Sequence, residues 1–320
     1  MDQTVKPRLS VVVLAWDGLH ETRRCVASVR DHTDVPFELI IVDNGSQPDA
    51  ARFASEASDR AILNPENLGF APGMNQGLEA SQGEFVAFCN NDTVMPPGWA
   101  STLIDDFETH ADAGIVLPAV TAAGNDCTVR SEPGTAVEVL LPFGEFPSGV
   151  LYVMRREVAT AVGGWSEEYP IASAEDLDLC FKVWANDLSI VFDQRVLVQH
   201  TSQATVATKL DNRRELYRSN LELFMDKWGS VEPAVPRIDS CHADRFRANL
   251  ARAATAIRWI RRLIATRDEL ERTRRQVRDL ERATDRRTEG SPPQRRSSLR
   301  RLTPGPVRRR LRPLLDRLRR

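Results

Sequence analysis

Short apolar runs alternate with amphipathic stretches along the first 90 residues. Each apolar run is brief and rich in β-branched or aromatic side chains, which is typical of buried strands. The predicted strands are residues 9–14, 37–42, 61–63 and 85–89. Helices are predicted between them, and the third helix starts near Pro72, since proline suits a first helical turn. Strands that alternate with helices predict an α/β domain with a mainly parallel sheet.

The second half of the chain changes character. Strands are predicted at residues 114–120, 149–154, 189–192 and 195–198, and residues 121–148 are predicted to be a loop because they are rich in Gly, Pro and polar residues. Three helices are also predicted. One follows the 149–154 strand and ends near residue 163, and the others span residues 175–185 and 212–228. The expected buried face of the 175–185 helix is Leu177, Leu179, Cys180, Val183 and Trp184.

The composition is that of a globular protein, with 42% hydrophobic and 28% charged residues among 320. No run of about 18 apolar residues occurs, so no transmembrane helix is expected. The N-terminus has no long apolar segment of the signal-peptide kind, so we expect a cytoplasmic protein. The five cysteines are widely spaced, which favours reduced, mostly buried thiols.

Charge is distributed unevenly along the chain. Residues 244–320 contain 25 arginines, no lysine and nine acidic residues, a net charge of +16, whereas residues 1–243 carry −18. We therefore expect a catalytic body at 1–243, a helical extension at 244–289 and an arginine-rich tail at 290–320. The tail is interpreted as an interfacial helix on an anionic membrane, as a partner-binding helix, or, with least support, as a nonspecific nucleic-acid contact; no specific nucleic acid is expected.

Polar clusters follow two of the predicted strands. Asp43 ends the second strand, where its carboxylate either accepts from an N–H of a bound base or caps a turn. Asn90, Asn91 and Asp92 end the fourth strand. Their hard oxygens suit Mg²⁺ or Mn²⁺ carrying a diphosphate, although such residues are also common in turns. Ligands of open α/β sheets bind at this edge of the sheet.

Three further features carry candidate chemistry. A glycine-containing loop at residues 64–75 enters a helix and offers backbone N–H groups to phosphates, but it fits neither GxxxxGK[ST] nor GxGxxG. Glu175 and Asp176 open a helix, where they either balance its dipole or supply a general base. His200 follows a strand and is either a metal ligand or a histidine satisfied by hydrogen bonds.

The order and spacing of these clusters resemble family 2 glycosyltransferases of the GT-A fold, over about residues 8–228. The resemblance is greatest to bacterial rhamnosyltransferase-type members that extend cell-surface glycans. The matching segments are residues 9–16, 40–46, 67–70 with Asn75, 88–92, 162–165, 175–180 and His200.

The resemblance implies a role for each matching residue. Ala15 and Trp16 would line the nucleotide pocket, and Asp43 would bind a pyrimidine base. The other implied nucleotide contacts are Asn67, Gly69, Asn90 and Asn91. Asp92 and His200 would bind a divalent cation, Mg²⁺ or Mn²⁺. Asp176, with Glu175 beside it, would deprotonate the acceptor hydroxyl.

One residue departs from the pattern of the family. Asn90 stands where the family usually has the first carboxylate of Asp-x-Asp, which removes a negative charge from the metal site. Either metal affinity falls, or the diphosphate supplies more of the coordination, or Asn90 binds the ribose instead. The identity of the metal is open for the same reason.

The implied function is inverting transfer of a sugar from a nucleotide-diphosphate sugar to a hydroxyl of a glycan or lipid-linked acceptor in cell-wall polysaccharide synthesis. dTDP-rhamnose is the favoured donor, with UDP-galactofuranose or a UDP-hexose as alternatives, and the enzyme would lie peripherally on the inner face of the membrane. Residues 169–174 would line the acceptor site, and Trp165 either stacks on a sugar or packs in the core. The competing function is a noncatalytic glycan-binding or membrane-scaffold relative. A nucleotidyltransferase is disfavoured because residues 15–18 lack a glycine-rich basic loop.

Overall fold

A computed structural model describes residues 6–132, 134–140, 149–201, 213–228 and 272–273. Apart from residues 272–273, the expected helical extension and arginine-rich tail lie outside the described residues, as does Cys241. Within the described parts, no helix is long and apolar enough to cross a membrane.

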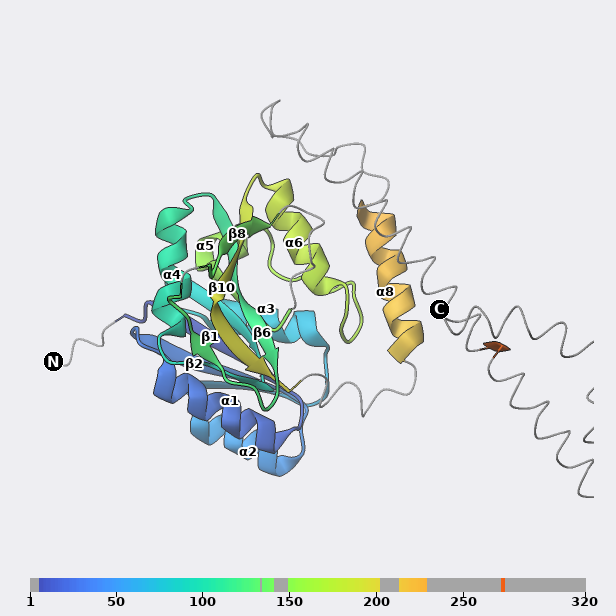
Figure 1. Cartoon of the computed structure of the whole chain (residues 1–320). Helices are drawn as coiled ribbons and strands as arrows, with labels where there is room; N and C mark the ends of the chain where they lie inside the picture. The colour runs from blue at the N-terminus through green and yellow to red at the C-terminus, as the bar shows by residue number, and fades with distance from the viewer. Residues whose placement is uncertain (1–5, 133, 141–148, 202–212, 229–271, 274–320) are drawn as a thin grey trace, which may run out of the picture. The chain divides into compact units, whose positions relative to one another are not determined.

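The ten strands of the described residues form one mixed sheet, in the order β3-β2-β1-β4-β9-β6-β10-β5, with β7 and β8 also paired to β10. Figure 1 labels β1, β2, β6, β8 and β10 of this sheet. The strands are β1 Leu9–Ala15, β2 Phe37–Asn44, β3 Arg60–Asn64, β4 Phe85–Asn90, β5 Thr93–Val94, β6 Ala113–Ala122, β7 Thr128–Val129, β8 Val137–Leu140, β9 Leu151–Arg155 and β10 Ser189–His200. Strands β1 to β4 are parallel, as are β6 and β10, while β9 runs antiparallel between β4 and β6. The predicted α/β architecture with a mostly parallel sheet is confirmed.

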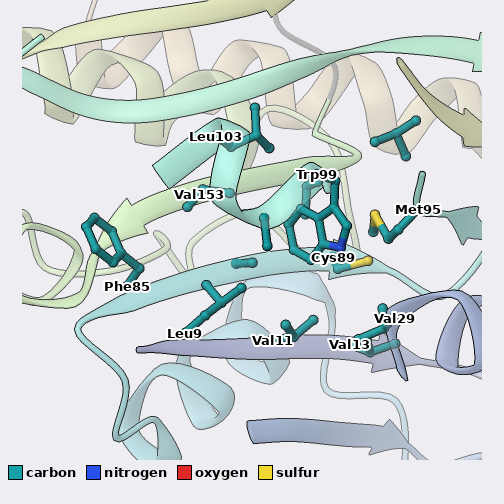
Figure 2. Close-up of a cluster of buried hydrophobic side chains, with 14 of the residues drawn as sticks. Leu9, Val11, Val13, Val29, Phe85, Cys89, Met95, Trp99, Leu103 and Val153 are labelled. Atoms are coloured by element: carbon teal, nitrogen blue, oxygen red, sulfur yellow. The ribbon is translucent and has the colours of Figure 1, made fainter. Parts of the chain in front are cut away.

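Helices cover both faces of this sheet. They are α1 Leu19–His32, α2 Pro48–Ala57, α3 Phe70–Ala80, α4 Trp99–Thr109, α5 Arg156–Ala161 and α6 Glu175–Ala185. A further helix, α8 Arg213–Trp228, packs against α6, where Phe224 meets Phe181. Alternate residues of β1 point to opposite faces, so Val11 and Val13 pack with α1 and α4, whereas Val12 packs with α3 and α6. Figure 2 shows the first of these two cores, with Trp99 of α4 above β1 and β4.

Several sequence predictions need correction. Residues 121–148 are not all loop, because β7 and β8 pair with β10. Helix α4 and strand β5 were not predicted. The two strands expected at 189–192 and 195–198 are one strand, β10, interrupted by a register shift between Asp193 and Leu197. A β-bulge of this kind breaks the alternation that marks a strand in sequence.

The face of α6 also differs from the prediction. Leu179, Cys180 and Val183 are buried, but Leu177 and Trp184 are only partly buried. The fully buried positions include Asp178, which hydrophobicity alone would assign to the surface. Cys25, Cys89, Cys127 and Cys180 are free thiols, and all but Cys127 are buried, as expected for the described cysteines.

A buried charge cluster joins α4 to the bulge of β10. Arg195 contacts Asp193 at 2.7 Å and Asp106 at 2.9 Å, and Asp106 is only 3% exposed. Burial, with the nearby Asp193 carboxylate, raises the pKa of Asp106 to about 7. The native state therefore holds a proton that the unfolded chain releases, so this group's contribution to stability is lost as pH rises from about 4 through about 7.

Candidate active site

The predicted site residues converge on one cleft of about 350 Å³ at the C-terminal ends of β1, β2 and β4. Residues that are far apart in sequence lie close together here because parallel strands end at the same edge of a sheet. The predicted residues that line the cleft are Trp16, Asn67, Asn90, Asn91, Asp92, Glu175, Asp176 and His200. Ala15, Asp43 and Gly69 lie beside the cleft in the same segments without lining it.

Asp43 lies at the end of β2 and is 2% exposed. Its Oδ2 accepts a hydrogen bond from the Ser46 backbone N–H at 3.1 Å, whereas its Oδ1 has no hydrogen-bond donor among the described residues. It pairs in register with Ala15, which precedes the cleft residue Trp16. A buried carboxylate oxygen without a donor is costly, so it points to a ligand N–H.

Asn44 is a cleft residue that the sequence prediction missed. Its Nδ2 donates to Asn67 Oδ1 and to the Gly69 carbonyl, both at 2.9 Å, and its Oδ1 accepts from the Leu68 N–H. Asn67 Oδ1 also accepts from the Gly69 N–H. Asn67 and Gly69 therefore shape the loop that enters α3. The strand-ending pair of Asp43 and Asn44 was the available signal, but it was assigned to Asp43 alone.

The turn after β4 separates its three polar side chains. Asn91 Nδ2 donates to Thr22 Oγ1 at 2.8 Å, which ties the turn to α1. Asp92 Oδ1 lies 3.1 Å from His200 Nε2. Strand β5 explains this contact, because its antiparallel pairing places Thr93 opposite His200, and the Thr201 N–H donates to the Asp92 carbonyl. Asn90 lines the cleft from the end of β4.

The chemistry of Asp92 and His200 fits a divalent cation. Two neighbouring ligands of an octahedral ion with bonds of about 2.1 Å lie about 3.0 Å apart, close to the observed separation. Within the described ranges, no group of three or more His, Cys, Asp or Glu side chains is placed to hold a metal. Oxygens of a bound diphosphate and water would therefore have to complete the coordination of an ion held by this pair.

Glu175 and Asp176 open α6 and both line the cleft. Glu175 is 6% exposed, and its Oε2 has no hydrogen-bond partner in the described chain. Burial, reinforced by the adjacent Asp176 carboxylate, raises the pKa of Glu175 well above its ordinary value. Burial also raises the pKa of Asp176, but backbone N–H donors such as that of Leu177 at 2.8 Å oppose the rise. Backbone N–H donors of Glu175 and Ser173 likewise oppose the rise at Glu175, and burial raises the pKa values of both carboxylates.

Gly149 leaves room for the side chain of Asp176. A Cβ atom at this position would lie 3.1 Å from both Cβ and Oδ2 of Asp176. Since such a contact is tighter than most Cβ contacts, any larger residue at 149 would displace the Asp176 side chain. The sequence prediction placed this glycine in a strand and gave it no part in the site.

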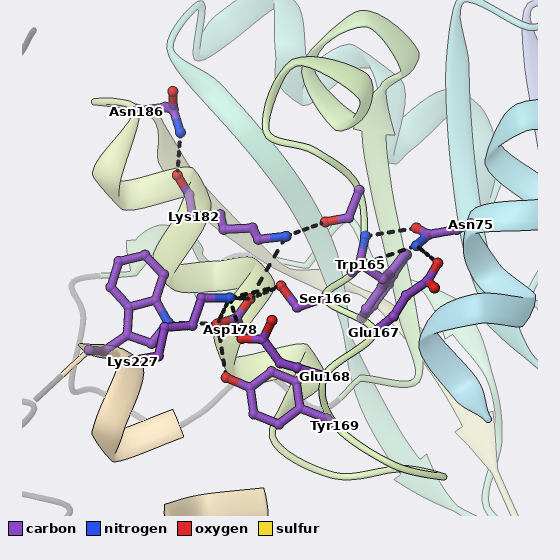
Figure 3. A network of polar contacts seen from close by, with 12 residues as sticks. Asn75, Trp165, Ser166, Glu167, Glu168, Tyr169, Asp178, Lys182, Asn186 and Lys227 are labelled. Atoms are coloured by element: carbon purple, nitrogen blue, oxygen red, sulfur yellow. Dashed lines mark hydrogen bonds and ion pairs between the residues drawn. The ribbon is translucent and has the colours of Figure 1, made fainter. Parts of the chain in front are cut away.

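Asp178 was also missed, although it anchors the helix that carries Asp176. It is fully buried, and its carboxylate accepts from Ser166 at 2.5 Å, Tyr169 at 3.0 Å and Trp228 Nε1 at 2.6 Å (Figure 3). Lys227 Nζ lies 3.0 Å from it. This network fixes α6 against α8 and the 166–169 segment. An acidic residue on a helix gives no sign in sequence that two of its partners, Lys227 and Trp228, lie 49 and 50 residues away.

Only part of the segment that was predicted to line the acceptor site lies in the cleft lining. Ile171, Ala172 and Ser173 line the cleft, but Tyr169 is buried and bonded to Asp178. Trp165 is 2% exposed, stacks on Tyr152 at 5.7 Å and does not line the cleft. Trp165 therefore packs in the core and is not a sugar-stacking platform.

A family model matches the part of the chain that contains β2, β4 and nearly all of β1. Residues 10–147 match the family described as Glycosyl transferase family 2. The uncharacterized protein y4gI of Sinorhizobium fredii is 26% identical over 72% of this chain and 28% of its own length. The glucosyl-dolichyl phosphate glucuronosyltransferase of Haloferax volcanii is 31% identical over 35% of this chain and 39% of its own length. The chain thus spans less than half the length of these two relatives.

Solved structures share the fold at low sequence identity. Residues 1–349 of TarS from S. aureus superpose with a TM-score of 0.54 and 18% identity, covering 76% of this chain and 70% of that one. The mannosyltransferase PcManGT from Pyrobaculum calidifontis was solved with GDP-Man and Mn²⁺. It superposes with a TM-score of 0.52 and 18% sequence identity, covering 80% of this chain and 77% of that one. The architecture of the described body is therefore the GT-A fold.

Proposed function

Since residues 10–147 match the glycosyl transferase family 2 model and the body has the GT-A fold, we propose that this chain transfers a sugar from a nucleotide-diphosphate donor to an acceptor hydroxyl, with inversion at the anomeric carbon. The observation that carries the proposal is the single cleft shared by the Asp92–His200 pair and the Glu175–Asp176 pair. One pair suits a leaving diphosphate and the other suits a nucleophile, which are the two requirements of direct displacement.

The donor half is formed by the strand ends. Asp43 Oδ1 accepts an N–H of the base, and Asn44 holds the loop that borders the nucleotide. Asp92 and His200 would hold a divalent cation, and Mn²⁺ is present in the solved PcManGT complex. When bound, such a cation neutralises charge that develops on the leaving diphosphate.

The acceptor half is formed by residues 171–176. Asp176 accepts the proton of the attacking hydroxyl, with Glu175 beside it in the lining of the cleft. The hydroxyl oxygen forms the new bond to the anomeric carbon as the bond to the diphosphate oxygen breaks. No covalent sugar–enzyme intermediate is required, so one base is sufficient.

The substrates are part of the same proposal. We favour dTDP-rhamnose as the donor, with UDP-galactofuranose or a UDP-hexose as alternatives, and a glycan or lipid-linked acceptor of the cell surface. The tail at residues 290–320 would hold the enzyme on an anionic bilayer near such an acceptor, on the inner face of the membrane. Deleting residues 291–320 should abolish flotation with anionic liposomes, and unchanged flotation would exclude this segment as the anchor.

A donor panel tests the function directly. Thermal shift with dTDP-rhamnose, UDP-galactofuranose, UDP-glucose and GDP-mannose, each with and without Mn²⁺, should single out one donor by its stabilisation. Asp176→Asn should bind that donor normally but lose about 10²- to 10⁴-fold in transfer rate, as expected for loss of a general base. No shift with any donor in the presence of metal would favour a noncatalytic glycan-binding or scaffold protein instead.

A further inference from the structure

The backbone immediately before the carboxylate pair is strained. Ile171, Ser173 and Ala174 have φ values of 65°, 90° and 70°, in the left-handed region that non-glycine residues seldom adopt. A β-branched residue such as Ile171 is a marked outlier there. Strained backbone of this kind persists only where surrounding contacts hold it in place, and it is concentrated at functional sites.

A single side chain from α8 holds this strained segment. Asn220 is fully buried, and its Nδ2 donates to the carbonyl oxygens of Pro170 at 3.2 Å, Ala172 at 3.0 Å and Ser173 at 3.1 Å. The NH₂ group has two hydrogens, so these three bonds are shared, and the Pro170 carbonyl also accepts from the Ala172 N–H at 2.9 Å.

The segment held by Asn220 determines where the base lies. Ile171, Ala172 and Ser173 form one wall of the cleft, and α6 begins with Glu175 and Asp176 directly afterwards. The far side of that wall is fixed by a 2.6 Å hydrogen bond from the Phe70 N–H to the Ile171 carbonyl.

Helix α8 makes a second contact on the other side of the base. Lys227 and Trp228 bind Asp178, two residues beyond Asp176 (Figure 3). Helix α8 therefore restrains the chain both before and after Asp176, although it contributes no residue to the lining of the cleft in the described structure.

We propose that Asn220 is a positioning residue for glycosyl transfer, whose side-chain amide fixes residues 170–174 so that Asp176 meets the acceptor hydroxyl. This inference rests on the proposed function. Loss of this amide should slow transfer while donor binding is kept, because the donor half of the cleft lies at the ends of β1, β2 and β4.

The test compares Asn220→Asp and Asn220→Ala with Ser219→Ala in the full chain with Mn²⁺. Asp has nearly the same shape as Asn, but it replaces the donating NH₂ by an oxygen that faces three carbonyl oxygens. Ala removes the group and serves if the Asp variant fails to fold. Ser219 is the matched control, because it is exposed on the same helix and, among the described residues, its hydroxyl donates to the Leu216 carbonyl of the same helix.

The rate of sugar transfer to the acceptor and the rate of donor hydrolysis are measured in the same reaction. Each rate is divided by the concentration of protein that binds UDP. Both Asn220 variants should lose about 10- to 100-fold in kcat, the range expected for a misplacement of about 1 Å, with donor KM within about twofold of wild type. The hydrolysed share of the donor should rise, since water needs less precise placement than the acceptor. A partly unfolded enzyme would lower both products equally, so an unchanged ratio of transfer to hydrolysis overturns the inference.

Hydrogen exchange provides a readout that does not require activity. Amides of residues 171–178 should exchange faster in the Asn220 variants than in Ser219→Ala, while those of β1 and β2 stay protected. Equal exchange in all three variants overturns the role of Asn220, whatever the wild-type activity is. A wild-type chain that transfers no sugar from any donor overturns the proposed function instead.

Discussion

Asp43→Asn is the sharpest perturbation of donor recognition. Asp43 Oδ2 is bonded to the Ser46 N–H at 3.1 Å, so the asparagine carbonyl should keep this bond and direct its NH₂ to the position of Oδ1. Oδ1 is the buried oxygen that has no donor in the described part of the chain. The substitution thus exchanges an acceptor for a donor at one atom, with little change in shape.

The expected loss follows from that one hydrogen bond. A bond to a charged group contributes about 1.5 to 3 kcal/mol, which corresponds to about 10- to 150-fold in Kd. Uracil and thymine present an N3–H, which would face the new NH₂, whereas cytosine presents an N3 acceptor. Asp43→Asn should therefore weaken UDP and dTDP by that factor and improve CDP relative to both.

Isothermal titration of UDP, dTDP and CDP at fixed Mn²⁺ measures the effect. Asp49→Asn is the matched control, since Asp49 is an exposed carboxylate on α2 that pairs only with Arg52 at 2.9 Å. The control should bind all three nucleotides as wild type does. If Asp43→Asn binds UDP within twofold of wild type and is fully folded, then Asp43 does not contact the base and the reasoning fails.

Three further predictions concern the base, the metal and pH. Gly149→Ala should lower kcat about 10- to 100-fold with unchanged donor affinity, because its Cβ displaces Asp176; normal turnover would refute that contact. His200→Ala should raise the Mn²⁺ concentration that half-saturates UDP binding about 10- to 100-fold, and EDTA should abolish the UDP thermal shift; a shift that survives EDTA would refute a metal at Asp92. For Asp106→Asn, the Tm advantage of wild type should shrink between pH 5 and pH 8, because the pKa of Asp106 is raised to about 7 and its protonated form stabilises the fold; a pH-independent difference would contradict this.

The sequence alone determined the framework of the fold. Strands such as residues 37–42 are short, apolar and β-branched, and that pattern depends only on the local chain and its burial on both faces. Polar residues just after such strands, Asp43 and Asp92 among them, could be assigned to one edge because parallel strands end together. The general position of the cleft followed from these two facts.

Other parts of the site were decided by tertiary contacts. The two-residue strand β5 is too short to have a periodicity, yet its pairing with β10 brings His200 to Asp92. Asp178 and Asn220 look like ordinary helical surface residues, but both are buried where α8 packs, Asp178 bonded to Trp228 and Asn220 bonded to the strained segment. Hydrophobic pattern reports which side of an element is buried, whereas a polar contact between residues 50 positions apart exists only once the chain has folded. For this reason the sequence indicated most of the residues that line the cleft, and the tertiary structure alone determined what holds them in place.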